Sequence, residues 1–109
     1  MEEEKEMRVK ASYGYDKLLE LSKIQLINYG KNLENTVNNT FDTLILRDRY
    51  KLYKRYIMDE FDILYGLNIP SDIWHTKLTK NQIVLNIAVF EDAKKRLKKH
   101  LKRGYTYGQ

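Results

Sequence analysis

The apolar residues of this chain recur at intervals of three and four, and this spacing constrains the fold more than any other feature. Residues three and four apart share one face of an α-helix, so each series predicts a helix with one buried side. The series are Tyr15, Leu19, Ser22, Leu26, Tyr29, Leu33, Thr36; then Leu46, Tyr50, Tyr53, Ile57, Phe61, Leu64; then Ile83, Ile87, Phe90, Leu97, Leu101. No segment alternates convincingly with a period of two, so we predict no strands.

Local signals mark the expected ends of these helices. The Asn- and Thr-rich stretch 35–40 favours a loop, and Gly66 is placed to end the second helix at its C′ position. Pro70 breaks the chain, and Thr79-x-x-Gln82 resembles a capping box. We therefore expect an all-α bundle of three to four helices, at about 15–38, 41–65, a short 71–77 and 80–103.

One glycine leaves the number of helices open. Gly30 either ends the first helix at Tyr29 or lies inside a longer helix, at a cost of about 1 kcal/mol.

The chain of 109 residues is expected to form one domain, over residues 13–103. Residues 1–12 form an acidic segment and residues 104–109 a Gly/Tyr tail, and we expect both to be mobile. Cysteine is absent and the apolar runs are at most four residues long, so we expect a cytoplasmic protein that does not bind membranes. The abundance of Lys, Asn, Ile and Tyr is typical of viral and mobile-element proteins.

Positive charge is concentrated in the last third of the chain. The net charge is +5, and residues 71–109 carry nine Lys or Arg against three Asp or Glu. Within 94–103, seven of ten residues are basic. On a helix the outer side would carry the residues Lys95, Lys98, Lys99 and Lys102, with Arg103 beyond them. Such a surface can bind phosphates of a nucleic acid. An acidic protein surface, the chain's own acidic N-terminus, or solubility alone are the alternatives.

Two further segments are candidate contact surfaces. Basic and aromatic residues interleave over 47–56, where Arg49 and Arg55 are predicted to extend the basic patch and Tyr56 to contact a partner. Trp74 is expected either to pack against the bundle or, if half-exposed, to anchor a protein interface.

No pattern in the sequence indicates catalysis, a metal or a cofactor. The histidines are His75 and His100, and neither has a nucleophile or zinc-ligand pattern around it. The run from Arg96 to His100 differs from the Arg-x(4–6)-His motif of HEPN-type RNA-cleaving domains. It has three intervening residues and Leu97 at a usually polar position, so it does not match. We predict that the chain is not an enzyme and that His100 is a solvated member of the basic face.

The run from Ile63 to Trp74 resembles a helix-turn-helix, with Gly66 at the turn. The resemblance implies DNA reading. It departs from the usual pattern at Asp72, where an apolar residue is expected, with Ile73 one residue late.

These features predict a small non-enzymatic nucleic-acid-binding or regulatory protein that uses a C-terminal basic helix. DNA, RNA and protein partners all stay open. One alternative is a structural or assembly subunit of the virion or connector type, which would form a homo-oligomer by docking its acidic N-terminus on a neighbour's basic helix. Another is a helical inhibitor of a host protein.

Overall fold

A computed structural model describes residues 15–102, and all of its regular structure over that range is helical, as predicted. The elements are α2 (Tyr15–Leu19), α3 (Lys23–Phe41), α4 (Leu46–Tyr53), the π-helical turn η1 (Lys54–Met58), α5 (Asp59–Tyr65) and α6 (Lys80–Lys102). The predictions for residues 1–12 and 104–109 lie outside the described residues.

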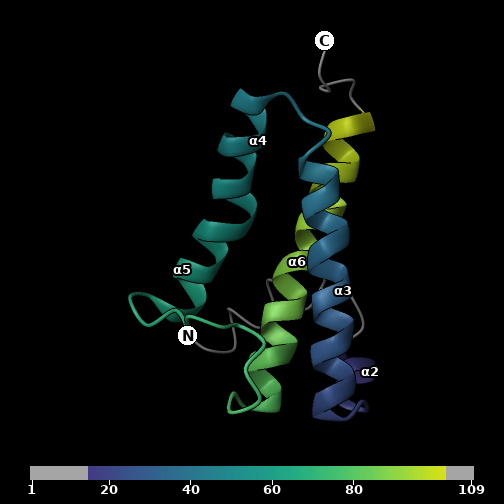
Figure 1. Cartoon of the computed structure of the whole chain (residues 1–109), viewed down its shortest axis with the longest axis vertical. Coiled ribbons are helices and arrows are strands. Elements are labelled where there is room, and N and C mark those ends of the chain that lie inside the picture. The colour runs from purple at the N-terminus through teal and green to yellow at the C-terminus, as the bar shows by residue number, and fades with distance from the viewer. Residues whose placement is uncertain (1–14, 103–109) are drawn as a thin grey trace.

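Helices α3 and α6 lie side by side and run in the same direction (Figure 1). Between them in sequence, α4, η1 and α5 form one arm that returns along the other side of α6. The arm contacts α6 mainly through η1 and α5, and α2 packs on the first half of α6. Helix α6 is therefore the centre of the bundle.

Helix α3 begins later and ends later than predicted. Ser22 and Gln25 form a capping box, so Ser22 is an exposed N-cap and not an inward residue. The helix continues through 35–40, where we predicted a loop, to Phe41. Thr36 is exposed, and the buried stripe runs instead through Leu26, Ile27, Gly30, Leu33, Val37 and Phe41. Burial of this stripe outweighs the poor helix propensity of the Asn and Thr residues.

Gly30 lies inside α3 and does not interrupt it. Its lack of a side chain allows the segment that carries Trp74 to approach the helix closely. Gly30 is buried, and a Cβ at this position would overlap the six-membered ring of Trp74, lying 2.9 Å from Cε3 and closer still to two other ring carbons. The Trp74 ring thus rests directly on the α3 backbone.

The second predicted helix, 41–65, is divided. It begins at Leu46, and the π-helical turn η1 interrupts it. Ile57 and Phe61 are buried as predicted, but Leu46 and Tyr50 are 72% and 74% exposed. A π-helical turn has more residues per turn than an α-helix, so it shifts the face that upstream residues present. Gly66 ends α5 with φ 64°, and its N–H donates to the Asp62 carbonyl at 2.7 Å, which confirms the predicted cap.

The segment 66–79 contains turns but no helix, so the predicted short helix at 71–77 is wrong. The helix-turn-helix resemblance fails for the same reason, because no second helix begins within the run after Gly66, and α6 starts only at Lys80. The segment is held instead by the fully buried Asn86 of α6. Its Nδ2 donates to the Ile73 carbonyl at 2.9 Å, and its Oδ1 accepts from the Tyr65 hydroxyl at 2.7 Å.

Helix α6 begins as predicted. Thr79 Oγ1 accepts from the Gln82 N–H at 3.1 Å, and Gln82 Oε1 accepts from the Thr79 N–H at 2.9 Å. The predicted inward residues Ile83, Ile87, Phe90 and Leu97 are buried, and Leu101 is half-buried. Val84, Ala88 and Val89 are also buried, so the first half of α6 is enclosed on more than one face.

Two tyrosines make the stability of this core sensitive to alkaline pH. Burial raises the pKa of Tyr65 above its ordinary value of 10.0. Burial, together with the nearby Glu34 carboxylate, also raises the pKa of Tyr53. The folded state therefore holds these protons more tightly than the unfolded state does.

The free energy of unfolding is accordingly expected to fall as the pH rises above about 10 through the folded-state pKa values. Urea titrations between about pH 9 and 11 would measure this fall. It should be smaller in a Tyr53→Phe/Tyr65→Phe variant. An unchanged slope in the double variant would contradict the assignment.

Candidate nucleic-acid interface on α6

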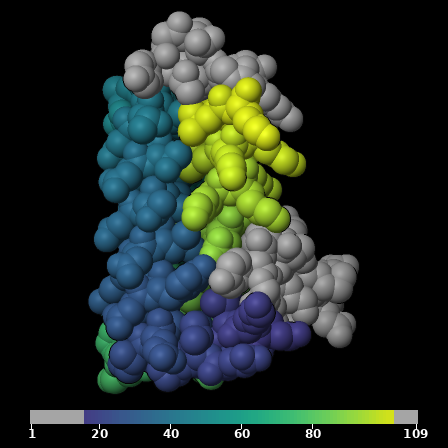
Figure 2. Space-filling model, turned by 90° about the vertical axis from the view of Figure 1, so that its right-hand side faces the viewer, coloured from purple at the N-terminus to yellow at the C-terminus, as the bar shows by residue number. Residues whose placement is uncertain are grey.

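The candidate interface is formed by four lysines on the C-terminal half of α6, which we call the lysine ridge: Lys95, Lys98, Lys99 and Lys102. The buried Leu97 orients this part of the helix against the bundle, so that these positions project outward. In Figure 2 the side chains of this half of α6 project away from α3. Cations here also suit the negative end of the helix dipole.

The four lysines line one shallow depression, together with Asp92 and Arg96. All four are exposed. Asp92 is the carboxylate of this lining, and its Oδ2 lies 3.2 Å from Nε of Arg96. Within residues 15–102, no carboxylate pairs with any of the four ammonium groups. The ridge therefore presents four ammonium groups to one place on the surface.

Arg96 lies beside the ridge but connects α6 to the arm. Its Nη1 lies 3.7 Å from Oε2 of the buried Glu60 in α5. Its guanidinium carbon lies 5.1 Å from the ring centroid of Tyr56 in η1. Tyr56, predicted as a partner contact, is half-buried, and its ring is engaged by this cation–π contact. The i,i+4 spacing of Asp92 and Arg96 could have predicted their ion pair from the sequence. Nothing in the sequence predicts the contact between Glu60 and Arg96.

His100 differs from its prediction as a solvated residue. It is half-buried, its Nε2 is shielded from solvent, and it lines a small depression with Tyr56, Arg96 and Lys99.

The two predicted arginines of the arm do not line the depression of the ridge. Nη2 of Arg49 donates to the carbonyls of Asp42 and Leu44, at 3.2 Å each, in the turn between α3 and α4. This use accounts for its half-buried position. Arg55 is exposed on η1, and Arg103 lies outside the described residues.

Trp74 follows the first of its two predicted alternatives, packing against the bundle. It is 6% exposed, and its Nε1 donates to Oε1 of Glu34 at 2.7 Å. A side chain so enclosed is not an interface anchor in this conformation.

Comparison with family models, curated proteins and solved structures finds no match to this chain. Within the described residues, no three His, Asp or Glu side chains gather as a metal site would require. No helix in the same part of the chain is long and apolar enough to cross a membrane.

Proposed function

We propose that this chain is a non-enzymatic protein that binds nucleic acid by its phosphate backbone, through the lysine ridge on α6. The supporting observation is the grouping of Lys95, Lys98, Lys99 and Lys102 around one depression, unpaired with carboxylates of the described residues. Lysine binds phosphate as a point charge without base selectivity. The proposed binding is therefore independent of sequence and open to either DNA or RNA.

The number of lysines sets the expected dependence on salt. If all four lysines contact phosphates, the logarithm of the binding constant should fall with the logarithm of the salt concentration. The expected slope is about −3.6 on duplex DNA and about −2.8 on a single strand. Anisotropy of labelled strands of about 20 nucleotides, paired and unpaired, between about 50 and 200 mM salt would measure both slopes.

A charge-matched pair of variants tests whether the ridge itself binds. Reversal of the ridge (Lys95→Glu, Lys98→Glu, Lys99→Glu, Lys102→Glu) is expected to abolish measurable binding. The control reverses four exposed lysines elsewhere, on α2, α3, α4 and the 66–79 segment: Lys17→Glu, Lys31→Glu, Lys51→Glu, Lys77→Glu. Both variants have the same net charge, and the control should keep most of the salt slope.

Equal loss in both variants would mean that binding follows net charge and not the ridge. Absence of wild-type binding at about 50 mM salt would refute the proposal, since phosphate contacts are strongest at low salt.

A further inference from the structure

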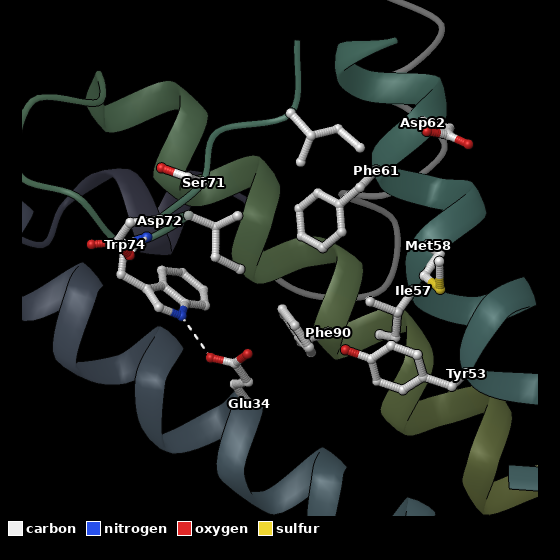
Figure 3. A pocket seen from close by; sticks show the side chains of 12 residues that line it. Glu34, Tyr53, Ile57, Met58, Phe61, Asp62, Ser71, Asp72, Trp74 and Phe90 are labelled. Atoms are coloured by element: carbon white, nitrogen blue, oxygen red, sulfur yellow. Dashed lines mark hydrogen bonds between the residues drawn. The ribbon is translucent and has the colours of Figure 1, made fainter. Parts of the chain in front are cut away.

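A second surface, separate from the lysine ridge, is a groove between α3 and the arm formed by α4, η1 and α5. It consists of two depressions that meet at Tyr53. One is lined by Glu34, Tyr53, Ile57, Met58, Phe61, Asp62, Ile69, Ser71, Asp72, Ile73, Trp74 and Phe90 (Figure 3). The other is lined by Asn38, Phe41, Asp42, Leu46, Arg49, Tyr50 and Tyr53. Neither shares a residue with the depression of the ridge.

Large apolar side chains are exposed along this groove. Among the described residues, seven large apolar side chains are exposed, and four of them line the groove: Leu46 at 72%, Tyr50 at 74%, Met58 at 51% and Ile69 at 42%. Single exposed apolar residues are common on protein surfaces, but their concentration in one concave strip is typical of a binding site.

The groove carries negative charge although the chain as a whole is positive. Its lining holds four carboxylates: Glu34, Asp42, Asp62 and Asp72. Arg49 is the cation of the lining, and its guanidinium is bonded to two backbone carbonyls. The other cations of the arm (Arg47, Lys51, Lys54 and Arg55) are not lining residues.

Two of these carboxylates are held in position by the buried tryptophan. One oxygen of Glu34 accepts from Trp74 Nε1 at 2.7 Å, drawn in Figure 3, and one oxygen of Asp72 accepts from the Trp74 N–H at 3.0 Å. Each carboxylate has a second oxygen to offer to a ligand. Asp62 is exposed on the opposite wall, on α5.

We propose that this groove binds a basic amphipathic helix of another protein. The apolar stripe of that helix would contact Leu46, Tyr50 and Met58, and its Lys or Arg side chains would meet the carboxylates at the rim. A helix laid between helices is a common mode of recognition, with anchors spaced by threes and fours. The wall from Leu46 to Met58 is roughly 20 Å long, which a partner helix of about 13 residues would match.

Charge and packing argue against two segments of the chain itself as the occupant of the groove. Residues 2–6 carry four Glu against one Lys, the same sign as the groove. The basic helix α6 of a second copy exposes its lysines but not an apolar stripe, because its apolar residue Leu97 is 1% exposed in the core. This proposal does not depend on nucleic-acid binding by the ridge.

Trp74 provides a readout for the test, since it is the single tryptophan of the chain and lines the groove. The probe is a helical Leu/Lys peptide of about 16 residues without aromatic residues. The control peptide keeps the Leu stripe and carries Glu in place of Lys. We expect the basic peptide to change Trp74 emission saturably, and the acidic peptide to bind at least about tenfold more weakly.

Matched variants separate the groove from the rest of the surface. Tyr50→Lys and Asp62→Lys, at exposed positions of the two depressions, are each expected to raise the Kd of the basic peptide about tenfold or more. Their controls are Ile24→Lys, at an apolar residue 60% exposed outside the groove, and Asp16→Lys, at an exposed acid outside the groove. Far-UV circular dichroism would check that all four variants are folded.

Three results would overturn the proposal. The basic and acidic peptides could bind equally well, or the control variants could weaken binding as much as the groove variants. Sedimentation could instead find a dimer that Tyr50→Lys dissociates, which would assign the groove to a second copy of the chain.

Discussion

Replacing Gly30 by alanine is expected to lower the free energy of unfolding by about 1–2 kcal/mol, although alanine is the better helix former. The new methyl group would overlap the Trp74 ring, which packs on the α3 backbone and donates a hydrogen bond to Glu34 of the same helix. Overpacking of this kind costs about 1–3 kcal/mol, and the gain in helix propensity recovers up to about 1 kcal/mol of it.

A double-mutant cycle would identify the cause. Trp74→Ala alone should cost about 3–5 kcal/mol, because it removes a large buried side chain. In that background Gly30→Ala should turn from destabilising to stabilising, by up to about 1 kcal/mol. Asn28→Ala, at an exposed position of the same helix, should be mildly stabilising in both backgrounds. Urea unfolding followed by circular dichroism measures all of these changes, and a stabilising Gly30→Ala beside an intact Trp74 would contradict the packing described.

The second large effect is expected at Asn86. Asn86→Leu should lower the free energy of unfolding by about 2–4 kcal/mol, because the Ile73 carbonyl and the Tyr65 hydroxyl both lose their partner inside the protein. Amide hydrogen exchange over 66–79 should also become faster, since the bond from Asn86 to the Ile73 carbonyl joins this segment to α6.

Tyr65→Phe is the matched control for this prediction. It removes only one of the two hydrogen bonds and should cost about 1 kcal/mol. If Asn86→Leu proved neutral, the two hydrogen bonds would contribute nothing net. The attachment of the 66–79 segment would then have to come from its other contacts, such as Trp74 on α3 and Lys23 Nζ, which donates to the Thr76 carbonyl at 3.0 Å.

The sequence predicted several parts of the fold that depend on neighbouring residues, although the equally local capping box of Ser22 and Gln25 was not predicted. The capping box at Thr79 and Gln82 and the left-handed Gly66 are local arrangements, and both are present. Helix α3 through 35–40 was not predictable in this way, because burial of Val37 and Phe41 decides it and not the propensity of the Asn and Thr residues.

The π-helical turn explains the main error in the second helix. The spacing of Leu46, Tyr50, Tyr53 and Ile57 indicates one continuous stripe only if every turn is α-helical. Because η1 occupies Lys54–Met58, the residues before it face a different direction from those after it. No residue type in that stretch predicts a π-helical turn.

The two candidate sites also differ in how far the sequence could predict them. The lysine ridge lies on one face of one helix, so its spacing was enough to group its four residues. The carboxylates of the groove come from α3, the turn after it, α5 and the 66–79 segment, and Trp74 joins two of them only after folding. Sequence spacing carries no information about such a grouping.

The parallel course of α3 and α6 has a consequence for the order in which the chain folds. The largest helix-to-helix contact joins two segments separated by the whole arm and the 66–79 segment. Such a contact forms slowly, because a long intervening stretch must first be ordered. During synthesis, the buried face of α3 stays without the helix that it contacts most until α6 has been made. This interval is when the chain is most open to aggregation and to capture by chaperones.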